Sequence, residues 1–114
     1  MSFTTKDFTT IRNDTFQAVT LDIDRDGSPI DLTGATIRMM LRLVKTQVSP
    51  DLSLSTPSSG ITITDAADGE FEIDEQIISI DAASYFYDLE VEEASGEVNT
   101  VMGGNFIVEQ DVTY

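Results

Sequence analysis

Residues 85–91 read Tyr-Phe-Tyr-Asp-Leu-Glu-Val, and this stretch decides the fold class. The odd-numbered positions hold Tyr, Tyr, Leu and Val, whereas two of the three positions between them are acidic. Successive side chains of a β-strand point to opposite faces of the sheet. The odd positions are therefore expected in the core and the even positions in solvent. The stretch predicts a half-buried β-strand.

The same alternation with a period of two occurs along most of the chain. It predicts strands over about residues 15–25 and 35–44, short strands at 61–63 and 71–73, and a last strand over about 105–112. The apolar side chains that alternate in this way are Val19, Leu21, Ile23, Ile37, Met39, Leu41, Leu43, Ile61, Ile63, Phe71, Ile73, Phe106, Val108 and Val112. About seven or eight short strands in one chain predict an all-β fold, an antiparallel β-sandwich.

Glycine-containing turns separate the expected strands. Asp26-Gly27, Asp68-Gly69 and Ser95-Gly96 lie between alternating runs, where hairpin turns require residues that tolerate positive φ. Residues 45–60 contain two prolines and five serines, so we expect one long surface loop there. Residues 75–84 fit either a short strand or a helical turn.

The composition excludes several classes of function. A chain of 114 residues fits one domain, and it contains neither Cys nor His. Disulfide scaffolds, thiolate zinc sites and histidine-based catalytic triads are therefore excluded. Carboxylates are abundant, but no two of them are marked out as an acid–base pair. We expect no enzymatic activity and no cofactor.

The charge is strongly acidic and unevenly distributed. The net charge is −15, and all six basic residues lie within residues 1–45, where six acidic residues balance them. Residues 46–114 hold 15 acidic residues and no basic one. Binding to nucleic acid or to anionic membranes depends on Lys and Arg, so neither is an expected partner. The acidic region either contributes to docking on a more basic protein surface or only keeps the protein soluble.

One motif resembles a metal site. Asp22, Asp24, Asp26 and Gly27 match the start of an EF-hand calcium loop, but Thr33 stands where that loop needs a bidentate Glu. In a strand, Asp22 and Asp24 would simply point into solvent. The three aspartates are a weak metal candidate, and we expect no metal.

Four side chains are candidates for a protein interface. Phe86 is expected to point outward from its strand, opposite to its tyrosine neighbours. Residues 1–13 form an expected N-terminal arm in which Phe3, Phe8 and Ile11 do not alternate, whereas residues 14–114 form the sandwich domain. The arm either adds a strand to a neighbouring subunit or packs on its own domain as an edge strand.

A series of turn and strand motifs follows the chain in order. Its members are Asp31 to Ile37, Asp65 to Gly69 before Phe71, Tyr85 to Val91, Gly96, Thr100, Gly103 to Val108, and Asp111 to Thr113. Over about residues 14–113 the series resembles the N-terminal domain family of the upper baseplate protein of tailed bacteriophages. The resemblance implies an immunoglobulin-like domain.

The resemblance also implies a function. Domains of that family hold receptor-binding proteins or fibres onto the tail or baseplate without catalysis. Because this chain stops at Tyr114, we expect an adaptor subunit rather than a receptor-binding protein, present in several copies in the virion and in the host cytoplasm during assembly. The expected partners are other virion proteins. One alternative is a capsid-decorating or head–tail joining protein, and another is a calcium- or carbohydrate-binding module that uses loops 22–31 and 45–60.

Overall fold

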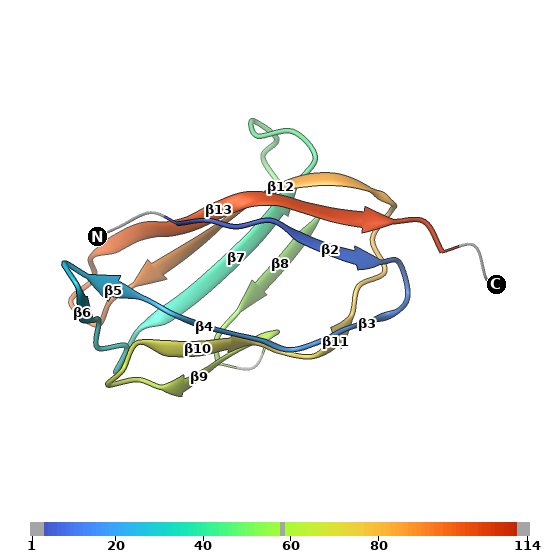
Figure 1. The fold of residues 1–114 in the computed structure, drawn as a ribbon. Coiled ribbons are helices and arrows are strands. Elements are labelled where there is room, and N and C mark those ends of the chain that lie inside the picture. Colours follow the sequence, from blue (N-terminus) through green and yellow to red (C-terminus); the bar gives the residue numbers. More distant parts are fainter. Residues whose placement is uncertain (1–3, 58, 112–114) are drawn as a thin grey trace.

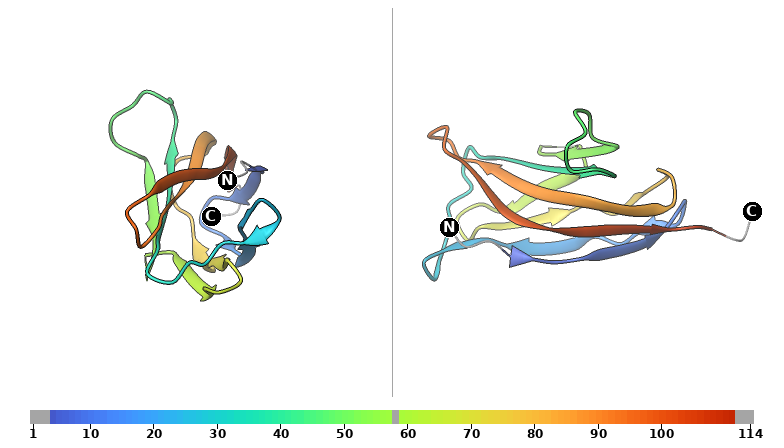
Figure 2. Two further views of the ribbon diagram at one scale, coloured as in Figure 1. Left: turned by 90° about the vertical axis from the view of Figure 1, so that its left-hand side faces the viewer. Right: turned by 90° about the horizontal axis from the view of Figure 1, so that it is seen from above.

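The alternating segments form two facing sheets of a sandwich (Figures 1 and 2). The computed structural model describes residues 4–57 and 59–111, and within these residues it contains strands and no helix. The first sheet consists of β1 (Thr4–Thr5), β2 (Phe8–Ile11), β7 (Thr36–Arg42), β8 (Leu52–Ser55), β12 (Ala83–Glu92) and β13 (Val98–Glu109). The second consists of β4 (Val19–Asp22), β9 (Ile61–Asp65) and β10 (Glu70–Ile73). Two small two-stranded sheets pair β3 (Thr15–Phe16) with β11 (Gln76–Ile77) and β5 (Asp24–Arg25) with β6 (Ser28–Pro29).

The strand order is that of an immunoglobulin-like domain. Such domains place strands C, F and G in one sheet and strands B, E and D in the other. Here β7, β12 and β13 occupy the first set of positions, with β8 added beside β7, while β4, β10 and β9 occupy the second. The expected all-β sandwich is confirmed. Eight of the strands in the described residues have at least four residues, and five more have two.

The sandwich is not wholly antiparallel, which corrects the expectation from the sequence. Both β1 and β2 run parallel to β13, with Thr4 opposite Met102 and Phe8 opposite Phe106. The connectivity permits parallel pairing, because the other strands of the described residues all lie between β2 and β13 in the sequence. No hairpin joins β2 to β13.

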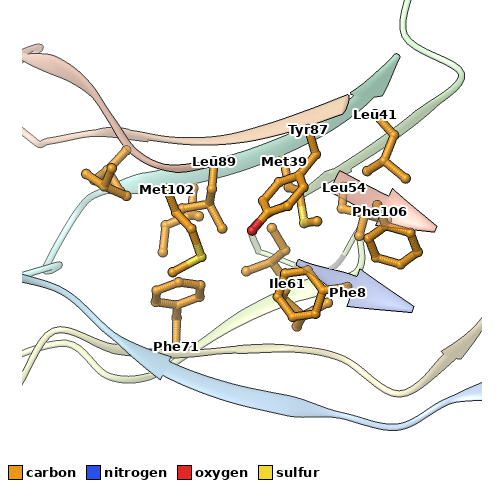
Figure 3. Packing of buried hydrophobic residues seen from close by; sticks show 14 of the residues in the cluster. Phe8, Met39, Leu41, Leu54, Ile61, Phe71, Tyr87, Leu89, Met102 and Phe106 are labelled. Atoms are coloured by element: carbon orange, nitrogen blue, oxygen red, sulfur yellow. The ribbon is translucent and has the colours of Figure 1, made fainter. Parts of the chain in front are cut away.

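The core between the sheets contains most of the side chains that the alternation selected, together with others such as Phe8, Leu54 and Met102 (Figure 3). Leu41, Leu89 and Phe71 have no exposed surface, and Tyr85 and Tyr87 are buried as well. The Tyr85 hydroxyl donates to the carbonyl of Asp81, four residues upstream, at 2.6 Å. This contact at the start of β12 corresponds to the tyrosine corner of immunoglobulin-like domains.

Three expectations from the sequence were wrong in detail. Leu43 is exposed, because β7 ends at Arg42. Residues 45–60 are not one loop, since β8 pairs with β7 there and buries Leu54. The strand expected over 15–25 is divided into β3, β4 and β5, because these segments pair with three different partners. Val112 lies outside the described residues.

Two of the sequence motifs meet at one end of the sandwich. The Asp31 carboxylate accepts bonds from the backbone N–H and the hydroxyl of Thr33, at 2.9 and 2.7 Å. Leu32, between these two residues, is buried, and its N–H donates to the Ala66 carbonyl at 2.8 Å. Gly69 has a φ of 68°, and a Cβ there would lie 2.6 Å from the Ile23 carbonyl oxygen. Only glycine fits this close approach.

The described part of the N-terminal segment pairs with β13 of its own domain, which is one of the two alternatives expected for the arm. Phe8 is buried and its ring packs within about 6 Å of the rings of Phe16, Tyr87 and Phe106. The Tyr87 hydroxyl donates to the Lys6 carbonyl. β1 and β2 are separate strands joined by an irregular step at Lys6, and Phe8 begins the second of them with its side chain in the core.

Candidate functional site

The three candidate metal ligands lie at the end of the β4 strand and in the β5–β6 hairpin. Asp22 closes β4, Asp24 begins β5, and Asp26 lies in the hairpin turn with a φ of 53°. All three side chains are exposed. Within residues 4–57 and 59–111, no group of three acidic, His or Cys side chains is placed to hold a metal ion.

The four interface candidates have different environments. Phe8 belongs to the core and Phe3 lies outside the described residues. Ile11 and Phe86 are 41% and 39% exposed and belong to different strands of the first sheet. Of these candidates, Phe86 lines a concave surface and is the starting point for the candidate site.

A shallow groove of about 460 Å³ lies on the outer face of the first sheet. Its lining residues are Met40, Arg42, Lys45, Phe86, Tyr87, Asp88, Thr100, Gly103, Gly104 and Asn105. The strand register explains this set. Phe86 of β12 lies between Arg42 of β7 and Asn105 of β13, and in the neighbouring row Asp88 lies between Met40 and Gly103. Because glycine has no side chain, the β13 side of the groove is hollow.

A braced loop borders the groove. Residues 43–51, which connect β7 to β8, project from the body of the sandwich (Figures 1 and 2). Gln47 organises the loop: its side-chain oxygen accepts from the Val44 N–H at 3.0 Å, and its amide nitrogen donates to Ser49 and Asp51. Asp51 also accepts from the Leu43 N–H at 3.0 Å. The loop is held by its own hydrogen bonds.

Three large apolar side chains of this loop are exposed. Val48 is 92% exposed, and the large side chains of Leu43 and Val44 are also exposed. The loop and the groove are adjacent, because the Lys45 ammonium lies 4.9 Å from the centroid of the Phe86 ring. Together they form one surface, here called the loop–groove surface, which consists of residues 43–48 and the groove residues Met40, Arg42, Phe86, Asp88, Gly103, Gly104 and Asn105.

The two cations of the loop–groove surface, Arg42 and Lys45, differ from Arg25 and Arg38 in their ionic contacts. Arg25 pairs with Glu93 at 2.6 Å, and Arg38 pairs with Glu90 and Glu92 at 2.7 and 3.0 Å. Within the described part of the chain, neither Arg42 nor Lys45 has a carboxylate within ion-pairing distance; the Arg42 Nε donates to the Gln47 carbonyl instead.

No protein-family model and no curated protein matches this chain. The described residues also contain no helix with the length and apolar character needed to cross a membrane. The fold, the loop–groove surface and the resemblance of the motif series therefore provide the basis for a functional proposal.

Sequence reasoning named Phe86 of this surface as an interface candidate, and it named residues 45–48 only as part of the loop used by the alternative binding module. Met40, Arg42 and Gly103 were missed because they come together only through the pairing of β7, β12 and β13. One signal was present in the sequence: two large aliphatic residues, Leu43 and Val44, are adjacent where a polar loop begins. Contiguous exposed apolar patches mark interaction sites.

Proposed function

We propose that the protein is a non-enzymatic structural protein of a bacteriophage virion, an adaptor subunit that attaches tail, baseplate or fibre components to each other. One observation carries this proposal: the ordered motif series between Asp31 and Thr113 resembles the domain family of the upper baseplate protein. The partners are other virion proteins. The protein is present in several copies in the virion, and it is in the host cytoplasm during assembly.

The placement of the motifs supports the proposal. The Asp31 turn and Gly69 hold one end of the immunoglobulin-like sandwich together, and residues 85–91 form its central strand. The series thus specifies a rigid scaffold. Such a scaffold would act geometrically, by presenting loops and sheet faces to two neighbours at a fixed distance. The loop–groove surface supplies Phe, Met and Arg, which are enriched in protein interfaces.

The test is to purify virions from a culture that produces the phage carrying this gene and to locate the chain with an antibody. Gold labelling at the tail tip or baseplate, together with quantitative mass spectrometry, supports the proposal. The major capsid protein serves as the positive control. Absence of the chain from purified virions contradicts it, and labelling at the head or neck would instead indicate a decorating or joining protein.

A further inference from the structure

We infer that the loop–groove surface is a docking site for a short segment of a partner protein that presents an aliphatic side chain flanked by carboxylates. This inference rests on the proposed function in one respect, that the protein acts by docking, and it names the chemistry of one partner.

The concentration of exposed apolar side chains is the first argument. Seven large hydrophobic side chains are exposed in the described residues, and four of them, Leu43, Val44, Val48 and Phe86, belong to this one surface. Three of the four lie within residues 43–48, and Lys45 of this stretch lies over the Phe86 ring, so the loop that carries them is next to Phe86. Exposed apolar side chains that gather in one region mark an interaction site more often than single exposed side chains do.

The second argument is that the loop is already ordered. Hydrogen bonds made by the side chains of Gln47 and Asp51 fix the loop on both sides of its tip. Ordering a loop on binding costs free energy and reduces affinity. A loop that is braced in the free protein avoids most of this cost. Val48 in this braced loop is 92% exposed and is therefore accessible to a partner.

The third argument concerns charge. Arg42 and Lys45 are cations without a carboxylate partner in the described residues of a protein with a net charge of −15. Asp88 is the one carboxylate among the residues that line the groove. A bound segment with two or more carboxylates would complete the ion pairs, while its aliphatic side chain would lie between Met40 and Phe86.

The same charges favour a short segment over larger partners. A second copy of this chain would bring a further −15, and an anionic bilayer would bring an extended negative surface, so both would be repelled by the rest of the protein. A short segment carries few charges. At about 0.1 M salt the screening length is about 10 Å, so the segment responds mainly to the charges that line the groove, two cations and the single carboxylate of Asp88, and less to the other carboxylates of the protein.

The test uses the purified full-length chain and a yeast-displayed library of random twelve-residue peptides. We expect selection to enrich peptides with Asp or Glu beside Leu, Ile, Val or Phe. Their affinity should fall at least tenfold for Val48→Asp and for Phe86→Ala. Lys45→Gln, which removes the charge of an exposed side chain and its contact with the Phe86 ring, should weaken binding and reduce its dependence on salt. Ile77→Ala, an exposed site outside the loop–groove surface, serves as the matched control.

Four results would overturn the inference: no enriched peptide, enrichment of basic peptides, equal binding to the wild-type chain and both surface variants, or binding of phosphatidylglycerol vesicles that depends on Val48. Circular dichroism of each variant establishes that it is folded. Virion labelling and peptide selection fail independently. If the chain is absent from virions but selects acidic peptides, only the phage assignment is lost, and the reverse result removes only the docking site.

Discussion

At the scale of single residues, the core depends on a few side chains that are fully buried between the two sheets. Leu41 on β7 and Leu89 on β12 lie on neighbouring strands, and each is fully buried. Phe86, one position from the buried Tyr85 and Tyr87, contributes mainly to the outer surface. The difference follows from the pleat of the strand, which reverses the direction of each successive side chain.

Truncation in the core should therefore be costly. We expect Leu41→Ala and Leu89→Ala each to lower the free energy of unfolding by about 2–5 kcal/mol, because each leaves a cavity. Val48→Ala, at an exposed loop position, should change it by less than about 0.5 kcal/mol. Urea denaturation measures all three. If both substitutions lower the free energy of unfolding by less than about 0.5 kcal/mol, the placement of Leu41 and Leu89 in the core is contradicted.

The Tyr87 hydroxyl should give the protein a characteristic response to high pH. Burial raises the pKa of Tyr87, and the nearby charge of Asp7 raises it further. The unfolded chain releases this proton near pH 10, whereas the folded chain retains it to higher pH. The stability that the proton contributes is complete below about pH 10 and is lost as the pH rises toward the folded pKa.

In the Tyr87→Phe variant, we expect the free energy of unfolding to be about 1 kcal/mol lower at pH 7, because the bond to the Lys6 carbonyl is lost. Above pH 10 the variant should lose stability less steeply than the wild type. Urea denaturation between pH 8 and pH 11 compares the two slopes. The lysines are common to both proteins, so their titration cancels in the difference. Parallel slopes would show that Tyr87 titrates normally.

At the scale of elements, the attachment of β1 and β2 to β13 depends on a glycine. A Cβ at Gly104 would lie 2.5 Å from the Lys6 carbonyl oxygen and 2.7 Å from the Asp7 carboxylate. The Asp7 carboxylate also accepts the Asn105 N–H at 2.9 Å. The close approach at Gly104 therefore allows the N-terminal segment to follow β13 between its two short strands.

Substituting this glycine should detach the N-terminal segment selectively. In Gly104→Ala we expect faster amide hydrogen exchange in β2, where residues 8–11 pair with β13, and little change in β9 and β10. Gly27→Ala is the control, since Gly27 also has a positive φ but has no atom near the position of an added Cβ. Uniform loss of protection throughout the sandwich would contradict a local role for Gly104.

At the scale of the whole molecule, repulsion between carboxylates opposes the compact state. The net charge is −15, and the ion pairs among the described residues relieve little of the repulsion because they involve partly exposed Arg12, Arg25 and Arg38. Exposed ion pairs contribute about 0.2–1 kcal/mol each. The Asp65–Asp68 turn illustrates the crowding, because the Asp65 charge raises the pKa of Asp68. Screening by salt should therefore stabilise the folded protein, because it weakens the repulsion between carboxylates more than it weakens the ion pairs.

Raising the NaCl concentration from about 10 mM to 1 M shortens the screening length from about 30 Å to about 3 Å. We expect the melting temperature to rise across this range. A gain of about 1 kcal/mol would correspond to a rise of about 4 °C or more in a protein of this size. Differential scanning calorimetry measures it. A melting temperature that falls with salt would mean that the ion pairs outweigh the repulsion.

Calcium should act on the whole molecule only through ionic strength. Asp22, Asp24 and Asp26 extend from a strand, a hairpin and its turn, and they do not form a cluster of ligands. Millimolar CaCl₂ should therefore raise the melting temperature no more than MgCl₂ does at the same ionic strength. A further rise that is specific to calcium, and that Asp24→Asn abolishes, would establish a site at these aspartates.

The sequence by itself determined the class of the fold and most of its core. The alternation in residues 85–91 and 35–42 specifies which face of each strand is apolar, and burial follows directly from that local pattern. The turns at Gly27 and Gly69 were also predictable, because a positive φ is a local requirement. Phe86 was placed outward by the same reasoning.

Only the tertiary structure decided which strands are neighbours. Pairing between β7, β12 and β13 brings Arg42, Phe86 and Asn105 into one row, although they are far apart in the chain. The parallel attachment of β2 and the short β8 within a Ser- and Pro-rich segment were decided in the same way. The physical reason is that a strand's alternation fixes its faces but not its edges. Backbone N–H and C=O groups are the same in every residue except proline, so the choice of partner and register depends on how the whole core packs.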